Sequence, residues 1–304
     1  MFLLAIYECV CRHIYPTLAF QSGENQSIGN YIRAQSYIYD HSDAQVVIVG
    51  SSLSFRLNTG LLPSRVFNLS FGGLSALEGM NIVMRVNTLP QTLYVETNAL
   101  GRDFSELSEY FDNQVLNPMR RWMISLRFAA RPLILAQSVL RSRVDRAWRM
   151  VIGNSAASGE TPATIAPKED APTLSLLSVQ KREKQIPLSS EAQARLIARL
   201  RTNITFFERH GVKVIFFEMP IHSELCDAPM QVSIRRLLHT EFRTHPYIRI
   251  TDCGTVTPRD GIHLSGADAE RVTRQFAKII EREMGSAAEE AEGHVGRNQA
   301  AAAN

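Results

Sequence analysis

The stretch VVIVGSSLSFRL, residues 46–57, decides the fold of this chain. It opens with four consecutive β-branched residues, Val46 to Val49, which is typical of a short strand buried on both faces of a parallel sheet. Gly50 ends this run, and Ser51 and Ser52 follow it. Open α/β sheets bind ligands just beyond the carboxyl ends of their strands, which is where Ser52 is expected. By itself, the stretch favours an ordinary strand followed by a capping serine, and the rest of the chain changes that interpretation.

Four further strands are predicted downstream, and helical segments separate them. The strands are expected at 66–70, 92–97, 212–220 and 247–252, and the main helices at about 27–40, 75–88, 190–210 and 265–284. Ser75 and Glu78 fit a capping box at the start of the second of these helices. The alternation of strand and helix predicts βαβ units, hence an α/β fold: a three-layer α/β/α sandwich around a five-stranded parallel sheet.

Residues 27–284 are predicted to form the main domain, which is interrupted by an insertion. The insertion, at about 102–188, has no convincing strand and contains a flexible loop at 153–172 that is rich in small residues and proline. The tail, 285–304, is predicted to be disordered.

The insertion is strongly basic and holds both tryptophans, Trp122 and Trp148. Such a segment suits an anionic membrane surface or an anionic polymer, and the alternative is a helical cap with solvated arginines. Between residues 120 and 149 the sequence has a single acidic residue, Asp145, against eight arginines: Arg120, Arg121, Arg127, Arg131, Arg141, Arg143, Arg146 and Arg149.

Residues 1–26 form an apolar N-terminal segment of ambiguous type. The first apolar run is too short to span a bilayer, which needs about 20 apolar residues. The segment also lacks the basic start and cleavage site of a signal peptide. It fits the remainder of a longer anchor, a helix on the membrane surface, or a helix packed on the domain.

Composition excludes some function classes. A net charge of +3 is too small to argue for nucleic acid, and the Cys and His residues lack zinc-type spacing. Of the four cysteines, Cys226 and Cys253 each follow a predicted strand and could meet above the sheet. A disulfide between them would imply an oxidising compartment, and two unrelated free thiols are the interpretation that the sequence favours.

Chemically useful side chains follow successive strands of the predicted sheet. Ser52 is a weak nucleophile that needs a base, and His263 can serve, with Asp260 orienting the imidazole from three residues away. The oxyanion formed on an attacked carbonyl needs donors, which the backbone N–H groups of Ser52 and Gly73 and the amide of Asn98 could supply. This set predicts a serine-dependent acyl-transfer site with no metal and no cofactor.

These residues resemble the sequence blocks of the SGNH (GDSL-type) hydrolase superfamily. GSSLS at 50–54 is similar to the first block, NLSFGG at 68–73 to the second, VETN at 95–98 to the third and DGIH at 260–263 to the last. The resemblance spans residues 45–284 except for the insertion. It implies a flavodoxin-like fold, with Ser52 as nucleophile, Asp260 and His263 as its partners, and Gly73 and Asn98 in the oxyanion hole.

Two departures from the motifs matter. The usual acid of the first block is Ser51 here, and the third block is shortened around Asn98. Both departures look more like the envelope branch of the superfamily, similar to alginate and exopolysaccharide O-acetylation proteins. That resemblance implies an O-acyl, notably O-acetyl, esterase or acyltransferase acting on an acylated envelope carbohydrate. It also implies a periplasmic, membrane-associated location and a membrane-bound acyl-transfer partner.

Alternatives remain open at this point. The chain could be a non-catalytic glycan-binding member of a polysaccharide modification or export complex, or a lipid-directed esterase. His222 follows the fourth predicted strand and could contact substrate, or act as the base if the DxxH turn were merely structural. The second role is disfavoured because no acid lies at a comparable spacing, Glu224 being the nearest. Glu96 and Glu218 are interpreted as strand-end polar residues rather than an acid/base pair.

Overall fold

The computed structural model describes residues 2–14, 26–102, 107–113, 115–137, 139–140, 173–258 and 260–302. Side chains are described from residue 176 onward in the segment 173–258, and up to residue 285 in the last segment. All five strands are parallel, in the order β2-β1-β3-β4-β5, which is a flavodoxin-like order. The predicted α/β class and five-stranded parallel sheet are therefore confirmed. The strands are β1 (Val46–Gly50), β2 (Val66–Ser70), β3 (Thr92–Glu96), β4 (Lys213–Glu218) and β5 (Tyr247–Arg249).

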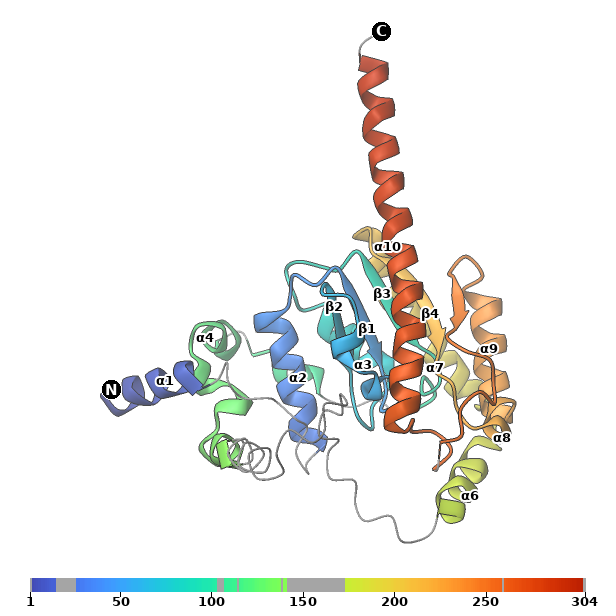
Figure 1. Cartoon of the computed structure of the whole chain (residues 1–304), viewed down its shortest axis with the longest axis horizontal. Coiled ribbons are helices and arrows are strands. Elements are labelled where there is room, and N and C mark those ends of the chain that lie inside the picture. The colour runs from blue at the N-terminus through green and yellow to red at the C-terminus, as the bar shows by residue number, and fades with distance from the viewer. Residues whose placement is uncertain are drawn as a thin grey trace, which may run out of the picture.

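Helices cover both faces of the sheet (Figure 1). Side chains alternate between the two faces of each strand, so Val47 and Val49 enter one core while Val46 and Ile48 enter the other. The first core is closed by α2 (Gln26–Asp40), α3 (Ala76–Val83), α7 (Ser190–Arg209) and α9 (Pro229–Glu241), and the second by α10 (Gly266–Ala302). These layers form the expected α/β/α sandwich.

The start of α3 differs from the predicted capping box. Ser75 is the N-cap residue, but its side chain makes no capping hydrogen bond. The Glu78 carboxylate points away from the helix start and accepts a hydrogen bond from the backbone N–H of Ser108. Glu78 is 1% exposed, so tertiary packing decides where its side chain bonds, and the capping-box prediction was wrong.

The insertion contributes short helices and no strand within its described residues. They are η4 (Ser108–Phe111), α4 (Leu116–Trp122), η5 (Ile124–Leu126), η6 (Phe128–Ala130) and α6 (Thr173–Lys184). Two of its arginines are buried rather than solvated: Arg127 pairs with Asp40 at 2.7 Å, and Arg120 lies over the Tyr110 ring. Trp148, the arginines from 141 to 149 and the predicted loop at 153–172 lie outside the described residues.

The N-terminal segment forms α1 (Phe2–Ile14), which packs on the insertion (Figure 1). The Glu8 carboxylate accepts hydrogen bonds from the backbone N–H groups of Ile124 (3.0 Å) and Ser125 (2.9 Å). Phe2 and Leu3 on the same helix are 78% and 81% exposed. Within the described part of the chain, no helix has the length and apolarity needed to cross a membrane.

The last helix is longer than predicted. The sequence places its end near Met284 and a disordered tail after it, whereas α10 continues to Ala302 and extends beyond the sheet (Figure 1). The residues past 284 are rich in Ala and Glu, which are strong helix formers, and this explains the difference.

Candidate active site

Ser52, His263 and Asp260 form one hydrogen-bonded chain at the carboxyl edge of the sheet. His263 Nε2 lies 2.9 Å from Ser52 Oγ, and His263 Nδ1 lies 2.5 Å from Asp260 Oδ2. With the proton on Nδ1 donated to Asp260, Nε2 is free to accept the Ser52 hydroxyl proton. The His263 and Asp260 side chains are 28% and 27% exposed, so the chain is shielded but reachable from solvent.

The loop that carries Asp260 and His263 is organised by the Asp260 carboxylate itself. Its Oδ1 accepts hydrogen bonds from the backbone N–H groups of Ile262 (3.1 Å) and His263 (2.8 Å). Gly261, which follows Asp260 directly, has φ +88°, and a Cβ there would lie 2.6 Å from the Leu177 side chain. A larger residue would therefore be strained and would clash, and glycine lets one tight turn deliver both acid and base.

The Asp260 carboxyl is held in its ionised form. Burial alone would raise its pKa, but the hydrogen bonds from the His263 side chain and from the backbone of His263 and Ile262 outweigh burial and lower the pKa to about 2. Asp260 is thus a carboxylate throughout the physiological range, as an orienting partner of an imidazole must be.

The turn after β1 places Ser52 beside the end of β2. Gly50 pairs with Ser70 in the parallel register, and the Phe71 N–H donates to the Gly50 carbonyl at 3.0 Å. Ser52 and Gly72 therefore each lie two residues beyond a paired position on neighbouring strands, which are spaced by about 5 Å. Residues 20 positions apart in sequence share this edge because the strands are parallel.

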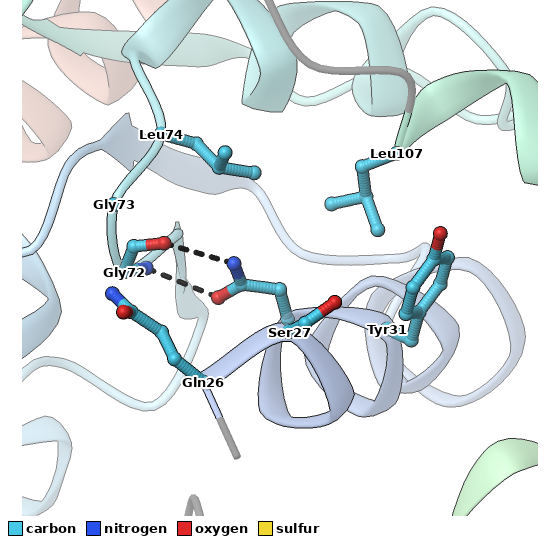
Figure 2. Close-up of a pocket in the computed structure, with 8 residues that line it drawn as sticks. Gln26, Ser27, Tyr31, Gly72, Gly73, Leu74 and Leu107 are labelled. Carbon is cyan, nitrogen blue, oxygen red and sulfur yellow. Dashed lines mark hydrogen bonds between the residues drawn. The ribbon is translucent and has the colours of Figure 1, made fainter.

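Gly73, the predicted oxyanion-hole glycine, follows β2 with φ +75°. It borders a cavity of about 320 Å³ at the start of α2 (Figure 2). Gln26 and Ser27 line the cavity with polar groups and Tyr31 with its ring, while Gly72 is held by two hydrogen bonds with the Asn30 side chain, 3.0 Å and 2.9 Å.

Asn98 lies at the same edge of the sheet, but its side chain is engaged. Its Oδ1 accepts from the Met219 N–H at 2.8 Å, and its Nδ2 donates to the Met219 carbonyl at 3.0 Å. The amide thereby tethers the end of β3 to the end of β4. Only one of its two N–H groups is left for an oxyanion, so that role stays a prediction.

His222 lies beside the triad loop and supports it through its backbone. Its N–H donates to the Gly261 carbonyl at 2.9 Å, while its Nδ1 accepts from the Glu224 N–H at the start of α8 (Ser223–Cys226). The structure therefore gives His222 a contact with the DGIH loop and a capping role, and the substrate contact stays a prediction.

A disulfide between Cys226 and Cys253 joins two loops near this site. Their Cα atoms are 6.2 Å apart, within the usual range for a disulfide. The preference for two free thiols was therefore wrong, because the two loops that follow β4 and β5 meet only in the folded sheet.

Sequence reasoning missed the importance of two buried glutamates at strand ends. Glu218 at the end of β4 pairs with Arg235 at 2.7 Å and accepts a hydrogen bond from Tyr247 at 2.9 Å, so it is structural. Among the described residues, Glu96 at the end of β3 accepts hydrogen bonds only from the turn that carries Ser52. Their burial could have been suspected from the apolar strands that precede them, but their partners could not.

No group of three or more His, Cys, Asp or Glu side chains that could hold a metal ion occurs among the residues that the structure describes. No protein-family model, curated protein or solved structure matches this chain. The geometry of the site and its chemistry are therefore what indicate a function for this chain.

Proposed function

We propose that this protein is a serine-dependent O-acyl esterase or acyltransferase that works through an acyl-serine intermediate. The observation that carries the proposal is the hydrogen-bonded chain from Ser52 through His263 to Asp260. A serine, an imidazole and an ionised carboxylate in this order are the groups that activate a hydroxyl for attack on an ester.

In the first half-reaction, Ser52 Oγ attacks the acyl carbonyl carbon while His263 Nε2 takes the hydroxyl proton. Asp260 keeps the other ring nitrogen protonated and stabilises the imidazolium that forms. When the tetrahedral intermediate collapses, the bond to the leaving alcohol breaks and His263 returns the proton to that oxygen. The product is an acyl ester on Ser52.

The backbone N–H groups of Ser52 and Gly73 are the donors proposed for the oxyanion. Neither donates a hydrogen bond to any residue that the structure describes, so both are available. The register of β1 and β2 brings the two segments side by side. Such donors matter most in the transition state, where charge develops on the carbonyl oxygen.

In the second half-reaction, water or an acceptor hydroxyl attacks the acyl carbonyl carbon and gives its proton to His263. The bond to Ser52 Oγ then breaks, and His263 returns the proton to Ser52. Hydrolysis and transfer therefore use the same residues and differ only in the nucleophile. The cavity beside Gly73 presents amide and hydroxyl groups together with the Tyr31 ring, Leu74 and Leu107, and polar groups beside an aromatic ring suit a sugar. A cell-envelope glycan or exopolysaccharide is thus the proposed substrate, and a membrane-bound partner the proposed acyl source.

A periplasmic, membrane-associated setting is part of this proposal. The Cys226–Cys253 disulfide is of a kind that persists in oxidising compartments. α1 and α4 each carry exposed apolar side chains, with Trp122 74% exposed, and the exposed Arg12 of α1 donates a hydrogen bond to the Trp122 carbonyl of α4. Exposed apolar and basic groups on two helices joined in this way suit contact with an anionic lipid headgroup region. The same helices favour a lipid-directed esterase as the second candidate function.

The test is hydrolysis of p-nitrophenyl acetate by the parent and by Ser52→Ala and His263→Ala. We expect activity in the parent, a loss of at least about a hundredfold in each variant, and no loss in the exposed control Ser64→Ala. An inactive parent on simple esters and on acetylated glycans would instead favour a non-catalytic glycan-binding protein. Adding acceptor sugars, and measuring acetylated product, separates transfer from hydrolysis.

A further inference from the structure

Glu96 is a buried carboxylate whose hydrogen-bond donors, within the part of the chain that the structure describes, all belong to the turn around Ser52. It is 1% exposed at the end of β3. Its Oε1 accepts from the Ser51 hydroxyl at 2.6 Å, and its Oε2 accepts from the backbone N–H groups of Ser51 (2.9 Å) and Ser54 (3.2 Å) and from the Ser54 hydroxyl (2.5 Å). A buried carboxylate is stable only when hydrogen-bond donors surround it, and here the turn supplies two backbone N–H groups and two hydroxyl groups.

The close approach of Glu96 depends on the residue that ends β1. A Cβ on Gly50 would lie 2.5 Å from Glu96 Oε2 and 2.1 Å from Ser54 Oγ. Any other residue at position 50 would push the carboxylate and the turn apart. Gly50 therefore serves packing against Glu96 rather than a backbone conformation reserved for glycine.

The turn is held on its other side by β2. Ser54 Oγ lies 2.8 Å from Ser70 Oγ, and the Asn68 amide donates to the Ser54 carbonyl at 2.8 Å. Ser51 and Ser54 are both fully buried and both anchored, and Ser52 projects between them toward His263. The anchors flank the nucleophile on each side in the sequence.

We propose that Glu96 is the positioning residue of the nucleophile, which holds Ser52 Oγ within reach of His263 and fixes the backbone N–H that faces the oxyanion. This inference rests on the proposed function. The hydrogen bonds that Glu96 accepts come from Ser51 and Ser54 rather than from Ser52, so it acts on the nucleophile through these two residues. Its carboxylate reaches Ser51, the very position where the resembled motif carries an acid, from the neighbouring strand.

The test compares Glu96→Gln with Glu218→Gln. Glu218 is the matched control, because it is also a strand-end glutamate, is 6% exposed, and pairs with Arg235 instead of the turn. An amide at position 96 would present N–H groups to backbone donors. The first readout is hydrogen exchange of a peptide covering residues 50–57, and the second is the rate at which phenylmethylsulfonyl fluoride labels Ser52. Both are measured on folded protein, and melting temperatures correct for stability.

For Glu96→Gln we expect exchange in the 50–57 peptide at least about tenfold faster, and labelling about 10- to 100-fold slower, with kcat lowered more than KM is raised. Glu218→Gln should lower the melting temperature without changing either readout. Wild-type exchange in Glu96→Gln, or equal changes in both variants, would overturn the positioning role. A different outcome would be that phenylmethylsulfonyl fluoride does not label Ser52 in the parent, while hydrogen exchange in Glu96→Gln still becomes faster. That outcome would contradict the proposed function and leave the anchoring of the turn by Glu96 intact.

Discussion

His263 Nε2 lies 2.9 Å from Ser52 Oγ, although 211 positions separate the two residues in the chain. The contact exists because Ser52 follows β1 near the middle of the sheet while His263 comes from the loop that leads from β5 into α10. Both loops leave the carboxyl edge of parallel strands, where such sheets form their binding sites.

Replacement of Asp260 by Asn should remove the orienting carboxylate and leave the loop in place. Asn keeps an oxygen for the N–H groups of Ile262 and His263, but favours the wrong histidine tautomer. We expect kcat on p-nitrophenyl acetate to fall by about 10²–10⁴. The exposed Asp252→Asn is the control, and equal activity in the two variants would count against the triad.

The same carboxylate should also affect acid stability. Because its pKa is lowered from 3.8 to about 2 in the folded state, Asp260 stabilises the fold above pH 4, and this contribution disappears as the pH falls through 2. After a discount for its partial exposure, the contribution is about 1–2 kcal/mol. Chemical denaturation of the parent and of Asp260→Asn at several pH values measures it, and the two should converge at low pH.

Asn98→Ala should lower both stability and activity. The substitution leaves the Met219 N–H and carbonyl without their hydrogen bonds at a buried position, at a cost of about 2–4 kcal/mol in the free energy of unfolding. With the second N–H of Asn98 as an oxyanion donor, as the sequence predicts, kcat of the folded variant should also fall by about 10²–10³. Retention of kcat within about tenfold would contradict the oxyanion role and leave Asn98 only its tether to Met219.

Glu78→Gln should stabilise the protein at neutral and higher pH. Burial raises the pKa of Glu78 to about 7, because the effect of burial outweighs the lowering effect of the hydrogen bonds from Ser108. Between pH 4.5 and 7 the folded state binds more protons than the unfolded state, so stability falls as the pH rises through that window. At pH 8 we expect a gain of about 1–3 kcal/mol in the variant. The exposed Glu109→Gln should show no such gain.

Loss of the disulfide should loosen the loops beside the site. The bond closes a loop with a sequence separation of 27, for which the loss is about 3–4 kcal/mol. The double variant Cys226→Ser/Cys253→Ser should therefore melt at lower temperature and lose activity, whereas Cys9→Ser, an exposed free thiol, should do neither. Alkylation of Cys226 and Cys253 in protein that has seen no reductant would contradict the bond.

The exposed apolar surface on α1 and α4 should bind anionic lipid. We expect co-sedimentation with vesicles of phosphatidylcholine and phosphatidylglycerol, weaker with phosphatidylcholine alone and at high salt. Replacing Phe2, Leu3 and Trp122 by Ser should weaken binding at least about tenfold, since each buried apolar side chain contributes about 1.5–3 kcal/mol. Leu176→Ser is the control, because this leucine is 53% exposed on α6, away from α1 (Figure 1). Equal binding by all variants would contradict the proposal.

Much of the fold follows from local pattern. The run from Val46 to Val49 predicts a buried strand, and the alternation of such runs with amphipathic helices predicts the parallel sheet. Helix ends were less predictable: α3 stops at Val83 rather than near 88, and Glu78 turns from a cap into a buried partner of Ser108. Both differences come from tertiary packing, which overrides weak local preferences.

The sequence by itself determined the order in which strands and helices follow one another along the chain. It also determined which residue types stand at each strand end, including Ser52, Asp260 and His263. Only the tertiary structure decided which of them meet. It brought those three into one hydrogen-bonded chain, committed the Asn98 side chain to Met219, and joined Cys226 to Cys253. It also gave Glu96 its partners in the nucleophile turn. The physical reason is that hydrogen bonds and burial depend on distances across strands, and a linear pattern carries no information about which buried donors a carboxylate will meet.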